Sequence, residues 1–168
     1  MATARELRNV SIFESLSDDQ LEAIIQLCRE ESFEPGVEIF RHGQKAKGLY
    51  VLLDGLVSLR ITAEEGIDLM AESLEKTGSV FGTSALVKPY IYNVTAKSTK
   101  NTKALVIDAA ELREIVKRDP VMGLEVMTQL ARLYYHRLNT TRMAITNLFK
   151  IFKFQVDKSK VFDTYGEL

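Results

Sequence analysis

The hydrophobic period of the chain changes twice along its length, and this division constrains the fold more than any other feature. Residues 1–31 and 109–152 repeat apolar side chains at helical spacing, whereas residues 32–108 alternate and turn often. Short strands separated by turns are typical of a β-sandwich or barrel and not of alternating strand–helix units. We therefore predict a mainly β fold with flanking helices: an N-terminal helical segment (1–31), a barrel (32–108), C-terminal helices (109–152) and a tail (153–168).

The first long helix has a clear start. Ser17 and Gln20 have the spacing of a capping box, and apolar residues follow at helical intervals as far as Cys28. We expect a helix over residues 18–30, with Cys28 as a small buried residue on its apolar face. Because Cys28 is the only cysteine, an intramolecular disulfide and a paired-cysteine metal site are both excluded.

Turn residues divide the middle segment into strands. Pro35-Gly36 and Gly43 precede a short apolar strand, Leu49–Leu53, and the Asp54-Gly55 pair after that strand is a hairpin signal. Further strands are expected at Leu56–Thr62, Ile67–Leu74, Tyr90–Lys97 and Lys103–Ile107.

Two helices are expected after the strands. Asp108 and Glu111 mark the start of a short helix. Asp119-Pro120 marks the start of a second, because proline suits the first helical position. The second helix can continue to Phe152, which corresponds to about 30 residues or roughly 45 Å.

One face of the long helix follows a heptad repeat, which is typical of a coiled-coil seam. A helix of this length outruns a small barrel, so we expect its second half to form a homodimer. Packing of the same face on the chain's own barrel is the alternative. The seam consists of Met127, Ala131, Tyr134, Leu138, Thr141, Ile145, Leu148 and Phe152.

Composition and motifs exclude several functions. A formal charge of -1 argues against a broadly basic nucleic-acid surface. The chain shows no secretory signal, and its longest apolar run, Leu49–Leu53, is far shorter than the roughly 20 residues of a membrane span. We therefore expect a cytoplasmic protein without membrane contact. His42 and His136 lack partners at metal-ligand spacing, so we predict no metal site, and no catalytic motif occurs.

The segment Gly78–Leu86 ends a strand in glycines and then enters a helix-prone stretch that begins Thr83-Ser84. Such a turn can present backbone N–H groups to an anion. A glycine followed by Thr-Ser is also ordinary helix capping, so the pattern alone leaves both interpretations open.

Together these segments resemble the cyclic nucleotide-binding domain family, which includes catabolite-activator-type regulators, kinase regulatory subunits and gated channels. The resemblance covers about residues 12–138 and rests on the runs 35–43 (PGVEIFRHG), 48–55 (GLYVLLDG) and 78–86 (GSVFGTSAL), the last at the position of the family's phosphate-binding cassette. It implies a double-stranded β-helix (jelly-roll) barrel. It also implies a ligand site formed by Phe81, Gly82, Thr83, Ser84, Ala85, Tyr92, Asn93, Val94 and Thr95, with Tyr134, Arg137 and Leu138 of the long helix over the pocket.

The cassette departs from the family at the two side chains that hold the ligand. The family's glutamate, which binds the ribose 2′-hydroxyl, is replaced by Thr83, and its arginine, which binds the cyclic phosphate, is replaced by Tyr92. A charged hydrogen bond contributes about 1.5–3 kcal/mol. The loss of both side chains therefore predicts an affinity for cAMP or cGMP that is roughly 100- to 1,000-fold weaker. Lys88 or Lys97 could reach inward instead, which strand alternation does not decide.

Two hypotheses follow from the resemblance. In the first, the chain is a stand-alone dimeric sensor, in which a cyclic nucleotide or related small ligand shifts the C-terminal helices. In the second, it is a ligand-free scaffold that acts through the helical seam. Activator-type members carry a winged helix-turn-helix domain after the long helix, which needs far more than the 16 residues after Phe152. The chain alone is therefore not expected to bind DNA, and neither a haem sensor nor an enzyme is favoured.

Overall fold

The computed structural model describes residues 4–62 and 68–151. It divides into two compact units, residues 1–130 and 131–168, and the first of these contains the barrel. The predictions made for Ile67, for Phe152 and for the tail lie outside the described residues.

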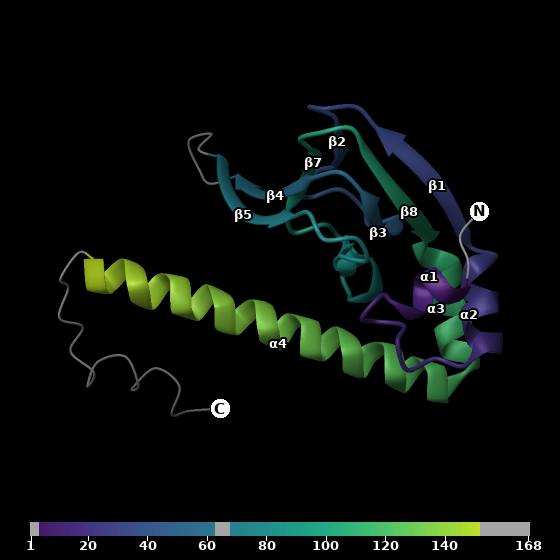
Figure 1. The fold of residues 1–168 in the computed structure, drawn as a ribbon. Helices are drawn as coiled ribbons and strands as arrows, with labels where there is room; N and C mark the ends of the chain where they lie inside the picture. Colours follow the sequence, from purple (N-terminus) through teal and green to yellow (C-terminus); the bar gives the residue numbers. More distant parts are fainter. Residues whose placement is uncertain (1–3, 63–67, 152–168) are drawn as a thin grey trace, which may run out of the picture. The chain divides into compact units, whose positions relative to one another are not determined.

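Two four-stranded antiparallel sheets make up the barrel (Figure 1). One sheet has the strand order β1-β8-β3-β6 and the other has the order β2-β7-β4-β5. The mainly β, jelly-roll-like fold with flanking helices is therefore confirmed. The strands are β1 (Cys28–Phe33), β2 (Glu38–Phe40), β3 (Gly48–Asp54), β4 (Val57–Thr62), β5 (Asp68–Leu74), β6 (Val80–Phe81), β7 (Thr95–Ser98) and β8 (Thr102–Asp108).

The barrel core is filled by side chains that point inward from both sheets. It combines large aromatic residues with small alanines, so that the interior closes around the rings. The buried cluster includes Phe40, Tyr50, Leu52, Val57, Leu59, Phe81, Ala85, Tyr92, Ala96, Ala104 and Val106.

Helices α1 (Ala4–Arg8), α2 (Asp18–Ile25) and α3 (Ala109–Arg118) gather at one end of the sheets (Figure 1). The predicted capping box at the start of α2 is present, because Ser17 and Gln20 bond each other's backbone amides. The carboxylate of Asp108 accepts hydrogen bonds from the first amides of α3. Since Asp108 also ends β8, this cap joins the barrel directly to α3.

The predicted end of α2 is wrong. The helix stops at Ile25, and Cys28 begins β1, where it is paired with Ile107 of β8. The helical spacing of apolar residues continues past the true end of the helix. The strand begins there because it pairs with β8, and this pairing depends on residues far away in the sequence, which the local spacing does not report. Cys28 is half-buried, and its thiol donates a hydrogen bond to the carbonyl of Ile24 at 3.1 Å. Burial raises the pKa of this thiol to about 12.

The hairpin predicted at Asp54-Gly55 is also wrong. β3 pairs with β6 and β8, whereas β4 pairs with β5 and β7, so this turn carries the chain from one sheet to the other. Gly55 adopts a φ of +104°, and a Cβ at this position would lie 2.5 Å from the carbonyl oxygen of Asn101. The glycine therefore serves a close backbone approach between loops and not a two-residue hairpin turn.

The strand predicted at Tyr90–Lys97 is shorter than expected. Only its second half is regular strand, as part of β7, while residues 90–94 form a loop. Backbone hydrogen bonds tie this loop to residues 43–46, including the Gly43 amide to the Tyr92 carbonyl and the Tyr92 amide to the Gln44 carbonyl. The loop thus holds residue 92 at the barrel interior without a continuous ladder.

Helix α4 (Pro120–Ile151) begins where the sequence predicts. The carboxylate of Asp119 accepts hydrogen bonds from the amides of Val121 and Met122 and also from the side chain of Gln20 in α2. The first turns of α4 pack in the first unit, where Met122, Val126 and Leu130 are buried. Within the described residues, α4 included, no helix is both long and apolar enough to span a bilayer.

Candidate functional site

A tight turn at Gly82 lies between β6 and the short 3₁₀ helix η2 (Thr83–Leu86). Gly82 has a φ of +72°, and a Cβ there would lie 2.9 Å from the ring of Tyr50 and 3.1 Å from the Gly48 carbonyl oxygen. Only glycine both adopts this positive φ without strain and leaves room for the Tyr50 ring and the Gly48 carbonyl. The cassette is therefore anchored directly against β3.

The cassette satisfies many of its own polar groups. The amide of Ala85 donates to the carbonyl of Gly82 at 3.0 Å, so it is not free to bind an anion. The hydroxyl of Ser84 donates to the side-chain oxygen of Asn93 at 3.0 Å, which links the cassette to the loop that follows it. Thr83, at the position of the family's glutamate, is buried. The structure thus brings the predicted cassette residues together around internal hydrogen bonds.

Tyr92 occupies the barrel interior. Its side chain is 3% exposed, and its ring stacks on Phe40 with a centroid distance of 3.8 Å. Its hydroxyl donates to the carbonyl of Gly48 at 2.8 Å and accepts from the amide of the same residue at 3.0 Å. The residue at the position of the family's arginine is thus held by both a ring contact and two hydrogen bonds to β3.

Tyr92 belongs to a cluster of four aromatic rings. Tyr50 stacks on Phe81 at 5.0 Å, and Phe40 lies 5.4 Å from Tyr50. Burial raises the pKa of both Tyr50 and Tyr92, so both hydroxyls are protonated at neutral pH. The cluster therefore presents neutral, aromatic surface at the position that the sequence comparison with the family assigns to its arginine.

A hollow of about 370 Å³ lies beside this cluster. Phe40, Tyr50 and Tyr92 line it together with Lys45 and Lys47, both of which are exposed. The two lysines escaped the sequence analysis, because they lie in an irregular loop between β2 and β3 where no spacing motif marks them. Of the lysines considered from the sequence, Lys88 is exposed in a turn, and neither Lys88 nor Lys97 lines this hollow.

Arg113 connects the cassette to helix α3. Its guanidinium donates to the carbonyl of Ala85 at 2.6 Å and lies 4.3 Å from the centroid of the Tyr90 ring. The first contact is a charge-assisted hydrogen bond and the second is a cation–π pair. Sequence reasoning missed Arg113, because its partners lie more than 20 residues away and no local pattern identifies them.

The remaining predicted residues have structural contacts. Val94 packs against the barrel core, and the Thr95 hydroxyl accepts a hydrogen bond from the amide of His42 at 3.1 Å. His42 lies in a turn, and His136 is exposed on α4. Among residues 4–62 and 68–151, no group of three or more His, Cys, Asp or Glu side chains is arranged to hold a metal ion.

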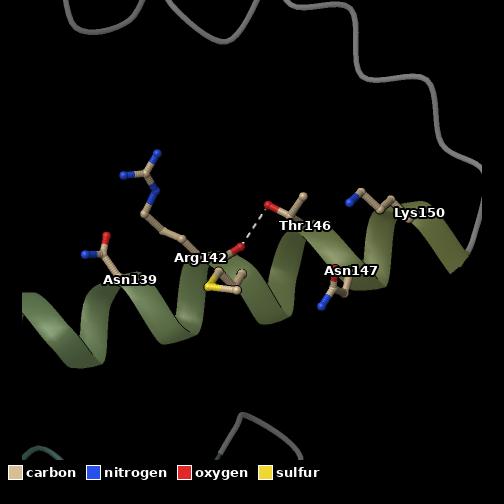
Figure 2. A pocket seen from close by; sticks show the side chains of 6 residues that line it. Asn139, Arg142, Thr146, Asn147 and Lys150 are labelled. Atoms are coloured by element: carbon tan, nitrogen blue, oxygen red, sulfur yellow. Dashed lines mark hydrogen bonds between the residues drawn. The ribbon is translucent and has the colours of Figure 1, made fainter.

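The second unit contains the rest of α4. Tyr134, Arg137 and Leu138 belong to it, and their predicted place over the pocket stays a prediction. Seam residues Leu138, Ile145 and Leu148 are 58%, 50% and 57% exposed. Another face of the helix carries polar residues that project to one side, including Asn139, Arg142, Thr146 and Lys150 (Figure 2).

Comparisons with known proteins agree on one family. The family model described as the cyclic nucleotide-binding domain matches residues 30–119. A crystal structure of a candidate cyclic nucleotide-binding protein from Geobacter metallireducens GS-15 is 34% identical, with a TM-score of 0.73 over 82% of this chain and 99% of that chain. The regulatory domain of Toxoplasma gondii PKA, solved with cAMP, has a TM-score of 0.67 at 17% identity, over 79% of this chain and 48% of that chain.

A candidate potassium channel protein from Rhodopseudomonas palustris is 29% identical over 117 residues. The match covers 70% of this chain but only 28% of the channel protein, so the chain spans less than a third of that relative's length.

Proposed function

Because the chain belongs to the cyclic nucleotide-binding domain family, we propose that it is a regulatory, non-catalytic module that couples the state of its barrel to its C-terminal helices. The observation that carries this proposal is the Arg113 contact between the cassette and α3. Family members regulate the proteins that contain them, and the kinase match noted above is to a regulatory domain. A cytoplasmic location is consistent with this role.

The proposed ligand class is a cyclic nucleotide, cAMP or cGMP, bound with low affinity. The support for low affinity is Tyr92, whose neutral ring fills the position of the phosphate-binding arginine. A ligand would first have to displace this ring from Phe40 and break two hydrogen bonds to Gly48. Lys45 and Lys47 could then supply some of the positive charge that the cassette lacks. We expect dissociation constants near millimolar and not micromolar.

Arg113 gives the barrel a route to its helices. Any movement of the Ala85 carbonyl or of the Tyr90 ring changes the contacts of a guanidinium that is rooted in α3. Because α3 leads directly into α4 through Asp119, a shift of α3 reorients the start of the long helix. We propose that ligand binding biases α3 between two positions through this contact.

The second candidate function is a ligand-free scaffold. The observation that favours it is the same closed aromatic cluster, since a barrel filled by its own side chains does not require a ligand for stability. In this case the function lies in the exposed seam of α4, which the heptad pattern predicts to pair with a second copy of the chain.

A thermal-shift titration tests these proposals. A ligand that binds only the folded state stabilises it by RT ln(1 + [L]/Kd), so 5 mM ligand at a Kd of about 1 mM adds about 1 kcal/mol. We expect a small shift with millimolar cAMP or cGMP, none with 5′-AMP as the matched control, and none at 10 µM. No change in Tm with cAMP or cGMP at any concentration would favour the scaffold. A full shift at micromolar ligand would contradict the role given to Tyr92.

A further inference from the structure

The hollow beside the aromatic cluster is built from two stretches of the chain that contain no acidic residue. The residues that line it lie within 39–53, apart from Tyr92, which lies within 76–107. Together these stretches contain eight Lys or Arg side chains and no Asp or Glu, whereas the rest of the chain contains 14 cationic and 23 acidic side chains. A ligand in the hollow therefore meets no carboxylate from the segments that form it.

Aromatic rings form the inner wall of the hollow. Phe40, Tyr50 and Tyr92 all line it, and the Phe40 ring lies 5.4 Å from the ring of Tyr50 and 3.8 Å from that of Tyr92. Burial raises the pKa of both tyrosines, so neither hydroxyl carries a negative charge at neutral pH. The wall thus offers aromatic contact to a ligand without repelling an anion.

Lys45 and Lys47 place positive charge at the hollow. Both are exposed, and neither forms an ion pair with any residue that the structure describes. The backbone that carries them is fixed: Lys45 is bridged to Ile91, and the carbonyl of Lys47 accepts a hydrogen bond at 3.0 Å from the amide of Ala109, the first residue of α3. A ligand that contacts the two lysines therefore does not have to order their loop, which lowers the cost of binding.

Two acidic side chains on neighbouring strands are each paired with an arginine. Glu31, whose charge affects the Tyr50 hydroxyl, accepts a hydrogen bond from Arg29 at 2.6 Å. Glu38 forms an ion pair with Arg41. Because each of these carboxylates has its own cation, neither cancels the charge that the lysines present at the hollow.

We propose that this hollow binds a small aromatic carboxylate. The ring of the ligand packs against the wall formed by Phe40, Tyr50 and Tyr92, and its carboxylate contacts Lys45 and Lys47 at the rim. A volume of about 370 Å³ lies near the lower end of the roughly 300–1,000 Å³ of small-molecule sites, which suits one ring with a short acidic side chain. The inference goes beyond the proposed function, because it requires neither a cyclic nucleotide nor movement of the Tyr92 ring.

The test titrates the ¹⁵N-labelled full chain with three small probes and follows the backbone amide chemical shifts. Phenylacetate has both the ring and the carboxylate, phenylacetamide has the same ring without the charge, and acetate has the charge without the ring. We expect phenylacetate to bind at least fivefold more tightly than either of the others at 50 mM salt, with its largest shifts at the amides of residues 44–48. Its affinity should fall at least threefold at 500 mM salt, where exposed charges are screened over about 4 Å.

Removal of the two lysine charges provides the second arm. A double variant with Lys45→Gln and Lys47→Gln should lower the affinity for phenylacetate at least fivefold and change that for phenylacetamide less than twofold. Lys88→Gln is the matched control, because Lys88 is exposed but does not line the hollow, and it should change phenylacetate affinity less than twofold. Circular dichroism verifies that both variants are folded, and the comparison of the three probes on the unaltered chain decides the question without either variant.

Three results would overturn the inference. The absence of shifts with 10 mM phenylacetate would show that the hollow does not take this class of ligand. Equal affinity for phenylacetate and phenylacetamide would show that the lysines do not select an anion. Shifts confined to amides outside residues 39–53 and 90–94 would place the ligand elsewhere on the chain. The titration with cAMP and cGMP uses different ligands and a different readout, so failure of this proposal is distinguishable from failure of the proposed function.

Discussion

The substitution Tyr92→Phe tests whether the aromatic cluster is locked by hydrogen bonds as well as by packing. Phenylalanine keeps the ring on Phe40 and removes only the hydroxyl, so the cavity left behind is smaller than a methyl group. The amide and the carbonyl of Gly48 both lose their partner in a buried position. An unsatisfied buried group costs about 1–3 kcal/mol. We therefore expect the free energy of unfolding to fall by about 2–4 kcal/mol.

The assay is urea unfolding and thermal unfolding of the full chain, each followed by circular dichroism. For a unit of this size, 1 kcal/mol corresponds to about 3–4 °C, so Tm should fall by about 6–16 °C. Tyr135→Phe is the matched control, because Tyr135 is 69% exposed and should change stability by less than about 0.5 kcal/mol. A change at Tyr92 no larger than this control would show that Gly48 is satisfied without the tyrosine hydroxyl, and the account of a locked barrel would be refuted.

Three further predictions follow from single contacts. Arg113→Ala should lower the free energy of unfolding by about 1–2 kcal/mol and speed hydrogen exchange at the amides around Ala85. Arg113→Lys, which keeps a charged donor, should show smaller changes in both. Unchanged exchange in Arg113→Ala would contradict the coupling between the cassette and α3. Gly55→Ala should lower the free energy of unfolding by more than about 3 kcal/mol, because the new Cβ would lie 2.5 Å from a backbone oxygen. Gly43→Ala is its control in the same urea titration: the new Cβ would meet open space, and the loss should be about 1 kcal/mol. Burial raises the pKa of Tyr50, so the stability that its protonated hydroxyl contributes is complete below a pH of about 10 and is lost as the pH rises toward the folded-state pKa. Tyr50→Phe should therefore reduce the fall in the free energy of unfolding at alkaline pH. An unchanged dependence of that free energy on pH would contradict this prediction.

Much of the architecture was predictable because its signals are local. Ser17 with Gln20, Asp108 and Pro120 each mark a helix start by groups within three or four residues, and the structure confirms all of them. The glycine-punctuated alternation of residues 32–108 likewise reports the strands. These signals are sufficient for a mainly β barrel between helices, because they depend on backbone conformation and hydrogen bonding within one turn of chain.

The errors share a physical cause. The Asp54-Gly55 turn was taken for a hairpin, although its glycine is needed for a contact with Asn101 and the flanking strands belong to different sheets. Helical spacing continued through Cys28, although pairing with Ile107 makes that residue the start of a strand. In each case a partner more than 40 residues away decided the outcome, and a local pattern contains no information about such a partner.

The candidate site divides in the same way. The resemblance to the family rests on residue identity and spacing, so the sequence was enough to predict the place of the cassette and to predict that Thr83 and Tyr92 stand where the family has its two charged residues. Only the tertiary structure decided what those replacements do. The hydroxyl of Tyr92 reaches Gly48, 44 residues away, and the guanidinium of Arg113 reaches Ala85, 28 residues away. Both contacts exist because the barrel closes and brings distant backbone groups within hydrogen-bonding distance.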